Sequence, residues 1–212
     1  RVGEFAVAPG PMMAARDNFE ILIQGRGSHA AMPHQGVDPV VVGSHIVLAL
    51  QTITSRNINP QESLVVSVTQ FHAGEAFNII PDTVTLKGTC RVFNSELQET
   101  LPDRIQQIVD GVSSTFGANS ELTYHKGYPA TINAASQANF CADVAKEIAG
   151  SEEGVDLKPT PSMGAEDFSY MLQQKDGAYI WLGAGKESAN LHSPLFDFND
   201  ELLPIGASLW VR

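Results

Sequence analysis

The strongest structural signal in this chain is a stretch in which apolar and polar side chains alternate, over residues 83–93. The two sets are Val84, Leu86, Cys90 and Val92 on one side, and Thr85, Lys87, Thr89 and Arg91 on the other. Because successive side chains of a strand point to opposite faces, this stretch predicts a strand with one packed face and one open face. The chain is therefore expected to build a sheet that is covered on one side.

The neighbouring segments predict the rest of that sheet and its cover. Apolar alternation predicts strands over residues 19–23 and 64–71, and apolar residues at helical spacing predict helices from residue 39 to about 55 and from 95 to 116. A further strand is expected to reach Lys126. The order strand, helix, strand, strand, helix, strand is that of a split βαβ, ferredoxin-like module.

Signals at the helix starts support both helices. Asp38 before Pro39 is an N-cap followed by proline at the first helical position. Ser95 and Gln98 have the spacing of a capping box, so we expect the second helix to begin at Ser95. Pro102 has no backbone N–H to donate and should kink or restart that helix.

A second region follows the module. Residues 129–133 have the character of a linker, and a helix is predicted over residues 136–149. A short helix after Glu166, a buried strand over residues 178–182 and a final helix from Asn199 would complete an α/β layer. We therefore expect an α/β chain of the α+β kind.

The composition excludes several classes of partner. Acidic residues exceed basic ones by 24 − 13 = 11, which disfavours binding to nucleic acid or to an anionic membrane surface. No apolar run approaches the length needed to span a bilayer. Cys90 and Cys141 could pair in principle, but two cysteines without a signal peptide suit a reducing cytoplasm better. We expect a cytoplasmic protein with no nucleic-acid or membrane partner.

The run from Gly27 to Pro39 concentrates the candidate chemistry. It contains two imidazoles, those of His29 and His34, between a predicted strand and a predicted helix. Gly25 and Gly27 let the backbone turn tightly after the strand. Both histidines are therefore expected at an exposed strand-to-helix corner.

Four motifs along the chain carry a family resemblance. They are residues 27–39, Asn78-Ile79-Ile80-Pro81-Asp82, Met163-Gly164-Ala165-Glu166-Asp167-Phe168 and Leu191-His192-Ser193-Pro194. Together they resemble the dinuclear-metal amidohydrolases related to hippurate hydrolase. That family also includes aminoacylases, zinc carboxypeptidases and plant auxin-conjugate hydrolases.

The resemblance implies a ferredoxin-like lid or dimerisation domain inserted in a metallopeptidase-type α/β catalytic domain. Residues 1–17 would end the N-terminal part of the catalytic domain, residues 18–128 would form the lid, and residues 129–212 would form the C-terminal part. Family members carry further metal ligands upstream: a His, a bridging Cys or Asp, an adjacent Glu pair and a further His. The resemblance therefore implies a fragment that lacks the N-terminal half.

The resemblance also assigns roles near the metals. His192 would be a metal ligand, and one imidazole cannot choose between Zn, Mn, Ni and Co. Glu166 would hold a ligand's orientation, although the dipole of the following helix favours acidic residues there in any case. His29 would reach the partner subunit's active site and stabilise the oxyanion, or else merely bridge its own turn. The spacing of His34 from His29 is not that of a helical metal pair, so we expect His34 to contact a site residue from behind or to stabilise the same turn.

Two residues are expected to contact the substrate. The resemblance places Asn78 against a substrate carboxylate or amide, while ordinary turn chemistry explains an Asn there equally well. Arg91 shares the open strand face with Lys87 and could hold a carboxylate through two parallel hydrogen bonds. A solvated charge on the strand face is the simpler alternative for Arg91.

The expected activity is metal-dependent hydrolysis of the amide bond of small N-acylated amino acids. The resemblance implies two divalent metal ions and a homodimer that forms through the lid. The alternative is a non-catalytic dimerisation or small-molecule binding module, because ferredoxin-like folds serve many functions. A metal-independent esterase or peptidase is disfavoured because no Gly-x-Ser-x-Gly motif occurs.

Residues 1–212 alone should not hydrolyse N-acyl amino acids, because the general base and most metal ligands of the family are not in this sequence. An amidase assay of the purified 212-residue chain, with and without a chelator, tests this expectation. Chelator-sensitive turnover by this chain would contradict it.

Overall fold

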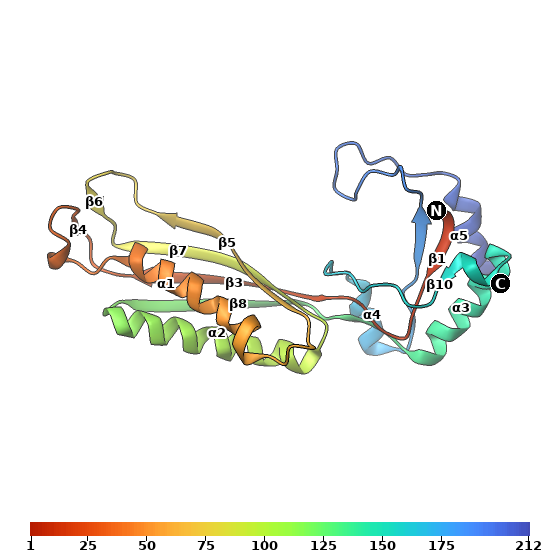
Figure 1. Ribbon diagram of the computed structural model, residues 1–212, viewed down its shortest axis with the longest axis horizontal. Coiled ribbons are helices and arrows are strands. Elements are labelled where there is room, and N and C mark those ends of the chain that lie inside the picture. Colours follow the sequence, from red (N-terminus) through yellow and green to blue (C-terminus); the bar gives the residue numbers. More distant parts are fainter. The chain divides into compact units, whose positions relative to one another are not determined.

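The computed structural model describes the whole chain, residues 1–212, as two compact units (Figure 1). The discontinuous unit combines Arg1–Ala14 with Ala130–Arg212, and the inserted unit is Ala15–Pro129. Both contain helices and strands, which confirms the expected mixed α/β class. None of the helices has the length and apolar character that a membrane crossing requires.

The inserted unit is built on one sheet with the strand order β5-β7-β3-β8, in which all neighbours are antiparallel. The strands are β3 (Ala15–Gln24), β5 (Leu64–Ala73), β7 (Thr83–Val92) and β8 (Asn119–Tyr128). Two helices, α1 (Pro39–Thr52) and α2 (Ser95–Phe116), cover one face of the sheet (Figure 1). This arrangement confirms the predicted split βαβ module.

The two faces of this sheet differ as the alternation predicts. Under the helices, apolar side chains of β3 and β7 such as Ile21 and Leu86 are fully buried with Ile46 of α1 and Ile105 of α2. The opposite side, which we call the open face, carries half-buried residues, mostly polar. On β3 and β7 these include Arg16, Asn18, Glu20, Lys87, Thr89 and Arg91.

The helix starts follow the sequence signals at α1 but not at α2. Asp38 is the N-cap of α1, as predicted, and its carboxylate accepts from two amides of the first turn. The N-cap of α2 is Asn94, whose side chain accepts from two amides, so the capping box predicted for Ser95 and Gln98 is wrong. The helix also continues through Pro102 without a restart.

The remaining elements of the inserted unit are short. They are β4 (Ser28–His29), η1 (Pro33–Gln35), η2 (Ile53–Asn57) and β6 (Ile79–Ile80). The strands β4 and β6 pair with each other and form a separate antiparallel ladder. The π-helical turn η2 prolongs α1.

The discontinuous unit contains a three-stranded sheet in the order β10-β1-β11 and a β2-β9 pair. Its elements are β1 (Val2–Ala6), β2 (Gly10–Met13), β9 (Thr131–Asn133), α3 (Ala135–Ala149), η3 (Glu152–Gly154), β10 (Val155–Asp156), α4 (Phe168–Gln174), β11 (Trp181–Ala184) and α5 (Leu202–Val211). The small side chains of α3 pack against the buried Phe5 and Val7. This packing forms the core of the unit.

Several predictions for this unit need correction. Residues 129–133 are more than a linker, because they contain β9 and the buried Asn133, whose side chain bonds the backbone of Tyr179 in both directions. The last strand lies at Trp181–Ala184 and is half-buried rather than buried. The last helix begins at Leu202 instead of Asn199. The helices predicted over residues 136–149 and after Glu166 are confirmed.

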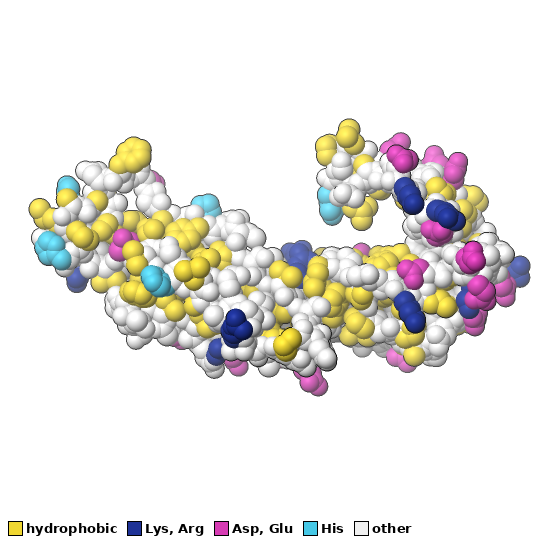
Figure 2. All heavy atoms as spheres, viewed as in Figure 1, with side chains coloured by type: hydrophobic (Ala, Val, Ile, Leu, Met, Phe, Trp, Pro, Cys, Tyr) yellow, Lys and Arg dark blue, Asp and Glu magenta, His cyan; other side chains and the backbone are white.

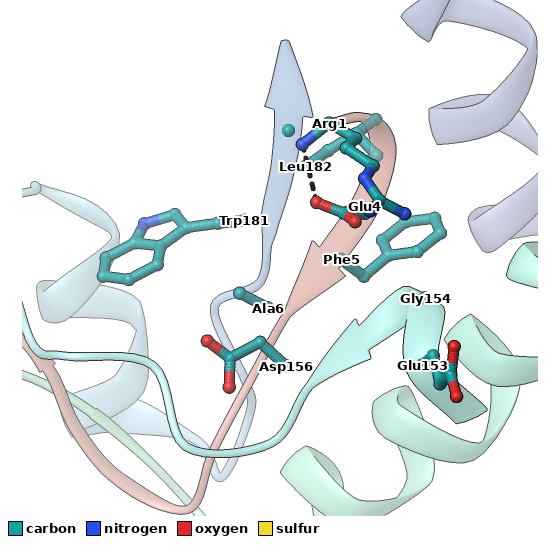
Figure 3. A pocket seen from close by; sticks show the side chains of 10 residues that line it. Arg1, Glu4, Phe5, Ala6, Glu153, Gly154, Asp156, Trp181 and Leu182 are labelled. Carbon is teal, nitrogen blue, oxygen red and sulfur yellow. Dashed lines mark hydrogen bonds and ion pairs between the residues drawn. The ribbon is translucent and has the colours of Figure 1, made fainter. Parts of the chain in front are cut away.

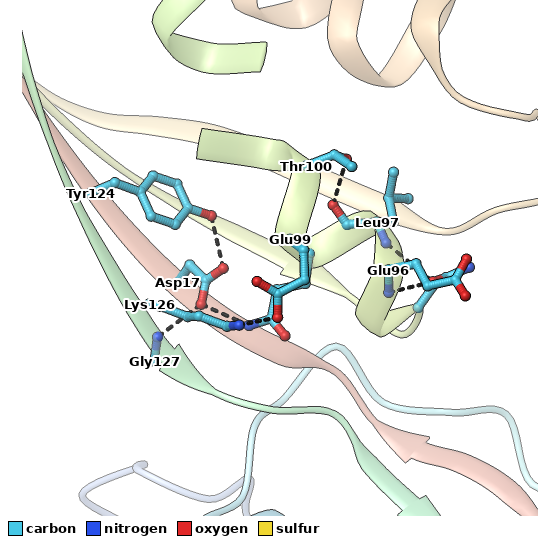
Figure 4. Close-up of polar contacts among 10 residues, drawn as sticks. Asp17, Glu96, Leu97, Glu99, Thr100, Tyr124, Lys126 and Gly127 are labelled. Carbon is cyan, nitrogen blue, oxygen red and sulfur yellow. Dashed lines mark hydrogen bonds and ion pairs between the residues drawn. The ribbon is translucent and has the colours of Figure 1, made fainter. Parts of the chain in front are cut away.

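A buried carboxylate joins three elements of the inserted unit. Asp17 of β3 is only 2% exposed, and it accepts hydrogen bonds from Gln98 Nε2 of α2 at 2.9 Å, Tyr124 Oη of β8 at 2.8 Å and the Gly127 amide at 2.8 Å (Figure 4). Three donors satisfy this acid in place of a cation. The network therefore holds α2 and the end of β8 against the start of β3.

The thiol of Cys90 lies in the same buried layer. Burial raises its pKa to about 12, so it stays protonated and unreactive at neutral pH. Cys90 is buried as expected, whereas Cys141 is only half-buried. Neither cysteine forms a disulfide.

Replacing Asp17 by Ala should destabilise the inserted unit by on the order of 3 kcal/mol, because several buried donors lose a charged acceptor together. Native-state hydrogen exchange of the β3 and β8 amides measures this loss locally. The matched control is Glu20→Ala on the same strand, where an exposed ion pair with Lys87 should contribute less than about 1 kcal/mol. Equal effects of the two substitutions would refute the assigned role of Asp17.

Candidate functional site

The structure brings two of the predicted site residues together at one end of the inserted unit. His29 of β4 faces Ile79 of β6 in the antiparallel ladder, and the Ala30 amide donates to the backbone oxygen of Asn78 at 3.0 Å. His29 and Asn78 are 49 positions apart in the sequence, and the backbone pairing places their chain segments side by side. We call the β4–β6 ladder with its flanking turns the tip.

Backbone contacts around two glycines hold the tip in place. The side chain of Asp82 accepts from the Gly27 amide at 2.7 Å, and its backbone oxygen accepts from the Gly25 amide at 2.8 Å. A Cβ on Gly25 would lie 2.2 Å from the backbone oxygen of Val37, so only glycine fits there. The strand that carries His29 is therefore anchored at its base.

The imidazole of His29 is exposed and has a defined hydrogen-bonding state. Its Nδ1 accepts a hydrogen bond from the Ala31 amide at 3.1 Å. In the neutral ring, an acceptor at Nδ1 places the proton on Nε2. His29 can therefore donate a hydrogen bond from Nε2 to a group outside the chain. His34, in η1, is also exposed and bonds neither His29 nor Asn78.

The structure places Arg91 in the four-stranded sheet, at the end far from the tip. Arg91 lies eight positions along β7 from Thr83, the residue nearest the tip. At about 3.3 Å per residue, this separation is about 26 Å. The inserted unit alone therefore does not unite Arg91 with His29 and Asn78.

Arg16 is a candidate that the sequence analysis missed. It lies on the open face of β3, directly opposite Arg91 of β7. Burial, and after it the positive charge of Arg16, lowers the pKa of Arg91. The predicted strand began at residue 19, so Arg16 was assigned to the preceding segment. The alternation extended backwards through Ala15 would have found it.

The other two predicted residues lie in the discontinuous unit. His192 is exposed in a turn after β11 with a φ of 67°, a left-handed conformation that is uncommon outside glycine. Glu166 precedes α4 and interacts with the phenol of Tyr179, whose pKa is raised first by burial and then by the charge of Glu166. No group of three or more His, Cys, Asp or Glu side chains is placed to hold a metal ion.

The discontinuous unit also contains a cavity of about 360 Å³ beside its three-stranded sheet (Figure 3). The walls include Glu4 and Phe5 of β1, Asp156 of β10 and Trp181 of β11. None of the predicted site residues lines this cavity. It therefore gives no support to the assignments made from the sequence.

Replacing Asp82 by Ala should loosen the tip, because the Gly27 amide loses a charged acceptor. We expect amide exchange at Gly27 and Ala30 to accelerate by about 10-fold, as the loss of one such hydrogen bond implies. The control is Glu121→Ala, an exposed acid on β8 of the same unit. Unchanged exchange at both amides in Asp82→Ala would show that the tip is held by other contacts.

Comparison with known proteins agrees with the motifs. The chain matches the model of Peptidase family M20/M25/M40 over residues 6–212. It is 35% identical over 210 residues to an N-acetyl-L-cysteine deacetylase of Bacillus subtilis, covering 99% of this chain and 49% of that protein. It is also 35% identical over 209 residues to hippurate hydrolase of Campylobacter jejuni, covering 99% of this chain and 54% of that protein. An IAA-amino acid hydrolase of Arabidopsis thaliana is 36% identical, with 98% of this chain and 49% of that protein covered.

A solved structure supports the same relationship. The Bacillus subtilis protein YXEP, described as a dinuclear metal binding peptidase of the M20 family, aligns with a TM-score of 0.78 and 27% identity, over 99% of this chain and 51% of that one. The chain spans about half the length of the curated relatives it matches. The resemblance carried by the four motifs is thus confirmed: the chain belongs to the peptidase family M20/M25/M40.

Proposed function

We propose that the protein containing this chain hydrolyses the amide bond of small N-acylated amino acids in the cytoplasm. The names of three relatives describe a deacetylase of N-acetyl-L-cysteine, a hydrolase of hippurate and a hydrolase of IAA-amino acid. Their shared chemistry is cleavage of a bond between an acyl group and an amino acid. The observation that carries the proposal is the anchored tip, which exposes the imidazole of His29 on a strand paired with the segment that follows Asn78. Two free cysteines support the location.

The proposed cofactor is a pair of divalent metal ions, and this chain fits part of such a site. The exposed imidazole of His192 is a suitable ligand, and Zn, Mn, Ni and Co all accept it. Glu166, beside the phenol of Tyr179, would hold a neighbouring ligand in orientation. We propose that the remaining ligands lie in the part by which the relatives exceed this chain. When bound, the ions would polarise the amide carbonyl and lower the pKa of a water molecule.

His29, Asn78 and Arg91 would each contact a different part of the substrate. The Nε2 proton of His29 would donate to the carbonyl oxygen as that oxygen gains negative charge. The amide of Asn78 would hold the substrate next to His29. The guanidinium of Arg91 would bind the free carboxylate of the amino acid through parallel hydrogen bonds. His34 would support the turn that follows His29.

The length of the sheet argues that one active site uses two chains. The tip and Arg91 are separated by about 26 Å along β7, which is longer than any small N-acyl amino acid. The tip and the Arg91 of one inserted unit therefore cannot contact the same substrate molecule. We propose that the tip of one chain completes the active site of its partner in a homodimer.

The surface of the inserted unit supports a homodimer that forms through this domain, which would be the lid. Strand β5 is at the edge of the sheet, so one row of its backbone groups has no neighbouring strand. The adjacent helix α1 exposes apolar side chains, including Val41 at 44% and Leu48 at 69%. Figure 2 shows hydrophobic atoms on the surface in this region. An exposed strand edge beside apolar side chains is suited to pairing with a second copy.

Mixing two inactive variants of the full-length enzyme tests both the chemistry and the dimer. His29→Ala should lower kcat by about 100-fold to 1,000-fold through loss of an oxyanion donor. His192→Ala should abolish activity through loss of a metal ligand. If His29 serves the partner's site, mixed dimers contain one complete site and recover activity well above either parent.

The readout is hydrolysis of N-acetyl and N-benzoyl amino acids after subunit exchange. His45→Ala is the matched control, because this histidine lies on α1 against Phe116 and has no proposed role. No recovery on mixing would show that His29 acts within its own chain. Full activity of His29→Ala would refute its role altogether.

A further inference from the structure

Two arginine side chains face each other on the open face, at the end of the sheet opposite the tip. Arg16 of β3 and Arg91 of β7 are directly opposite in the antiparallel register. Side chains so placed have Cβ atoms about 4.5–5.5 Å apart, and like charges at this distance destabilise a sheet. Further along the same strand pair, Glu20 faces Lys87 and forms an ion pair at 2.8 Å. The two strands thus contain one ordinary charge pair and one pair of like charges.

The surroundings of the two guanidinium groups strengthen their electrostatic attraction for an anion. Both side chains are half-buried, and Arg16 Cζ lies 5.6 Å from the centre of the Tyr128 ring. Charges interact more strongly in such partly dehydrated surroundings than in water. Burial and the neighbouring Arg16 lower the pKa of Arg91, in that order. An anion that binds between the two groups would therefore reduce the repulsion between them.

Asp17, the residue next to Arg16 on β3, does not form an ion pair with Arg16. Asp17 points to the opposite face, where it accepts hydrogen bonds from Gln98, Tyr124 and Gly127. The next position on the open face is Asn18, opposite Thr89, and neither residue carries a charge. This end of the open face is therefore positively charged and flanked by neutral polar groups.

We propose that Arg16 and Arg91 together bind the two carboxylates of N-acylated acidic amino acids, so that the enzyme prefers these substrates. The inference rests on the proposed function, in which Arg91 binds the α-carboxylate. Arg16 then binds the second carboxylate through charge-assisted hydrogen bonds of the same kind. Arg16 is in this account a specificity residue, because a neutral substrate would be cleaved without its help.

The test compares N-acetyl-L-glutamate with N-acetyl-L-glutamine, which have nearly the same shape and differ by one charge. For the full-length enzyme we expect kcat/KM to favour the glutamate by about 10-fold to 100-fold, as charge-assisted hydrogen bonds imply. Arg16→Gln should reduce this ratio to about 1 and leave the value for the glutamine compound within about twofold. Lys87→Gln, on the same face, should keep the ratio. Added salt should lower it in the wild type.

Three results would overturn the proposal. They are a wild-type enzyme that cleaves both compounds equally well, an Arg16→Gln enzyme that keeps the preference, and an Arg16→Gln enzyme that loses activity equally on both. If the full-length enzyme cleaves no N-acyl amino acid, the proposed function fails instead. Calorimetric titration of the two compounds then tests the arginine pair alone: a glutamate preference that Arg16→Gln removes supports the pair, and equal binding refutes it.

Discussion

The carboxylate of Asp17 is the contact on which the geometry of the inserted unit most depends. It occupies a position under the helices that an apolar side chain would normally fill, and three donors from α2 and β8 satisfy it. A buried acid of this kind has few alternative arrangements, because any other leaves donors and charge without partners. It therefore fixes α2, β3 and β8 relative to one another, and with them the position of Arg16 on β3.

The candidate site residues of the inserted unit lie at its two opposite ends. At the tip, a turn built on Gly25, Gly27 and Asp82 presents His29 and Asn78. At the opposite end, Arg16 and Arg91 form a positively charged patch on the open face. Because a strand is rigid, this separation does not close within one unit. The proposed function accordingly uses two copies of the chain, each of which would supply the end that the other lacks.

Much of the fold was predictable, and the errors share one physical origin. The strands that include Ile21 and Leu86 and the helix that starts after Asp38 follow from periodicity and capping alone. The start of β3 was missed because Asp17 occupies a position of its apolar face, and the donors that satisfy Asp17 lie 81 to 110 positions away. The α2 cap was misassigned in the same way, since Gln98 bonds Asp17 and does not return to its own helix end.

The candidate residues also divide into those that the sequence identified and one that only the structure revealed. His29, Asn78, Glu166 and His192 were found as members of motifs, and the family relationship follows from the sequence. Arg16 belongs to no motif, and its position became visible only when β3 and β7 were paired.

The sequence by itself determined the strand and helix types, the tight turn before His29, the charge balance and the family. These properties depend on neighbouring residues, whose spacing sets periodicity, capping and turn geometry. The tertiary structure alone decided that the strand of His29 pairs with the segment that follows Asn78, that Arg91 lies at the far end of its sheet and that Arg16 faces it. The reason is that strand register is set by contacts between segments far apart in the chain, which local patterns do not specify.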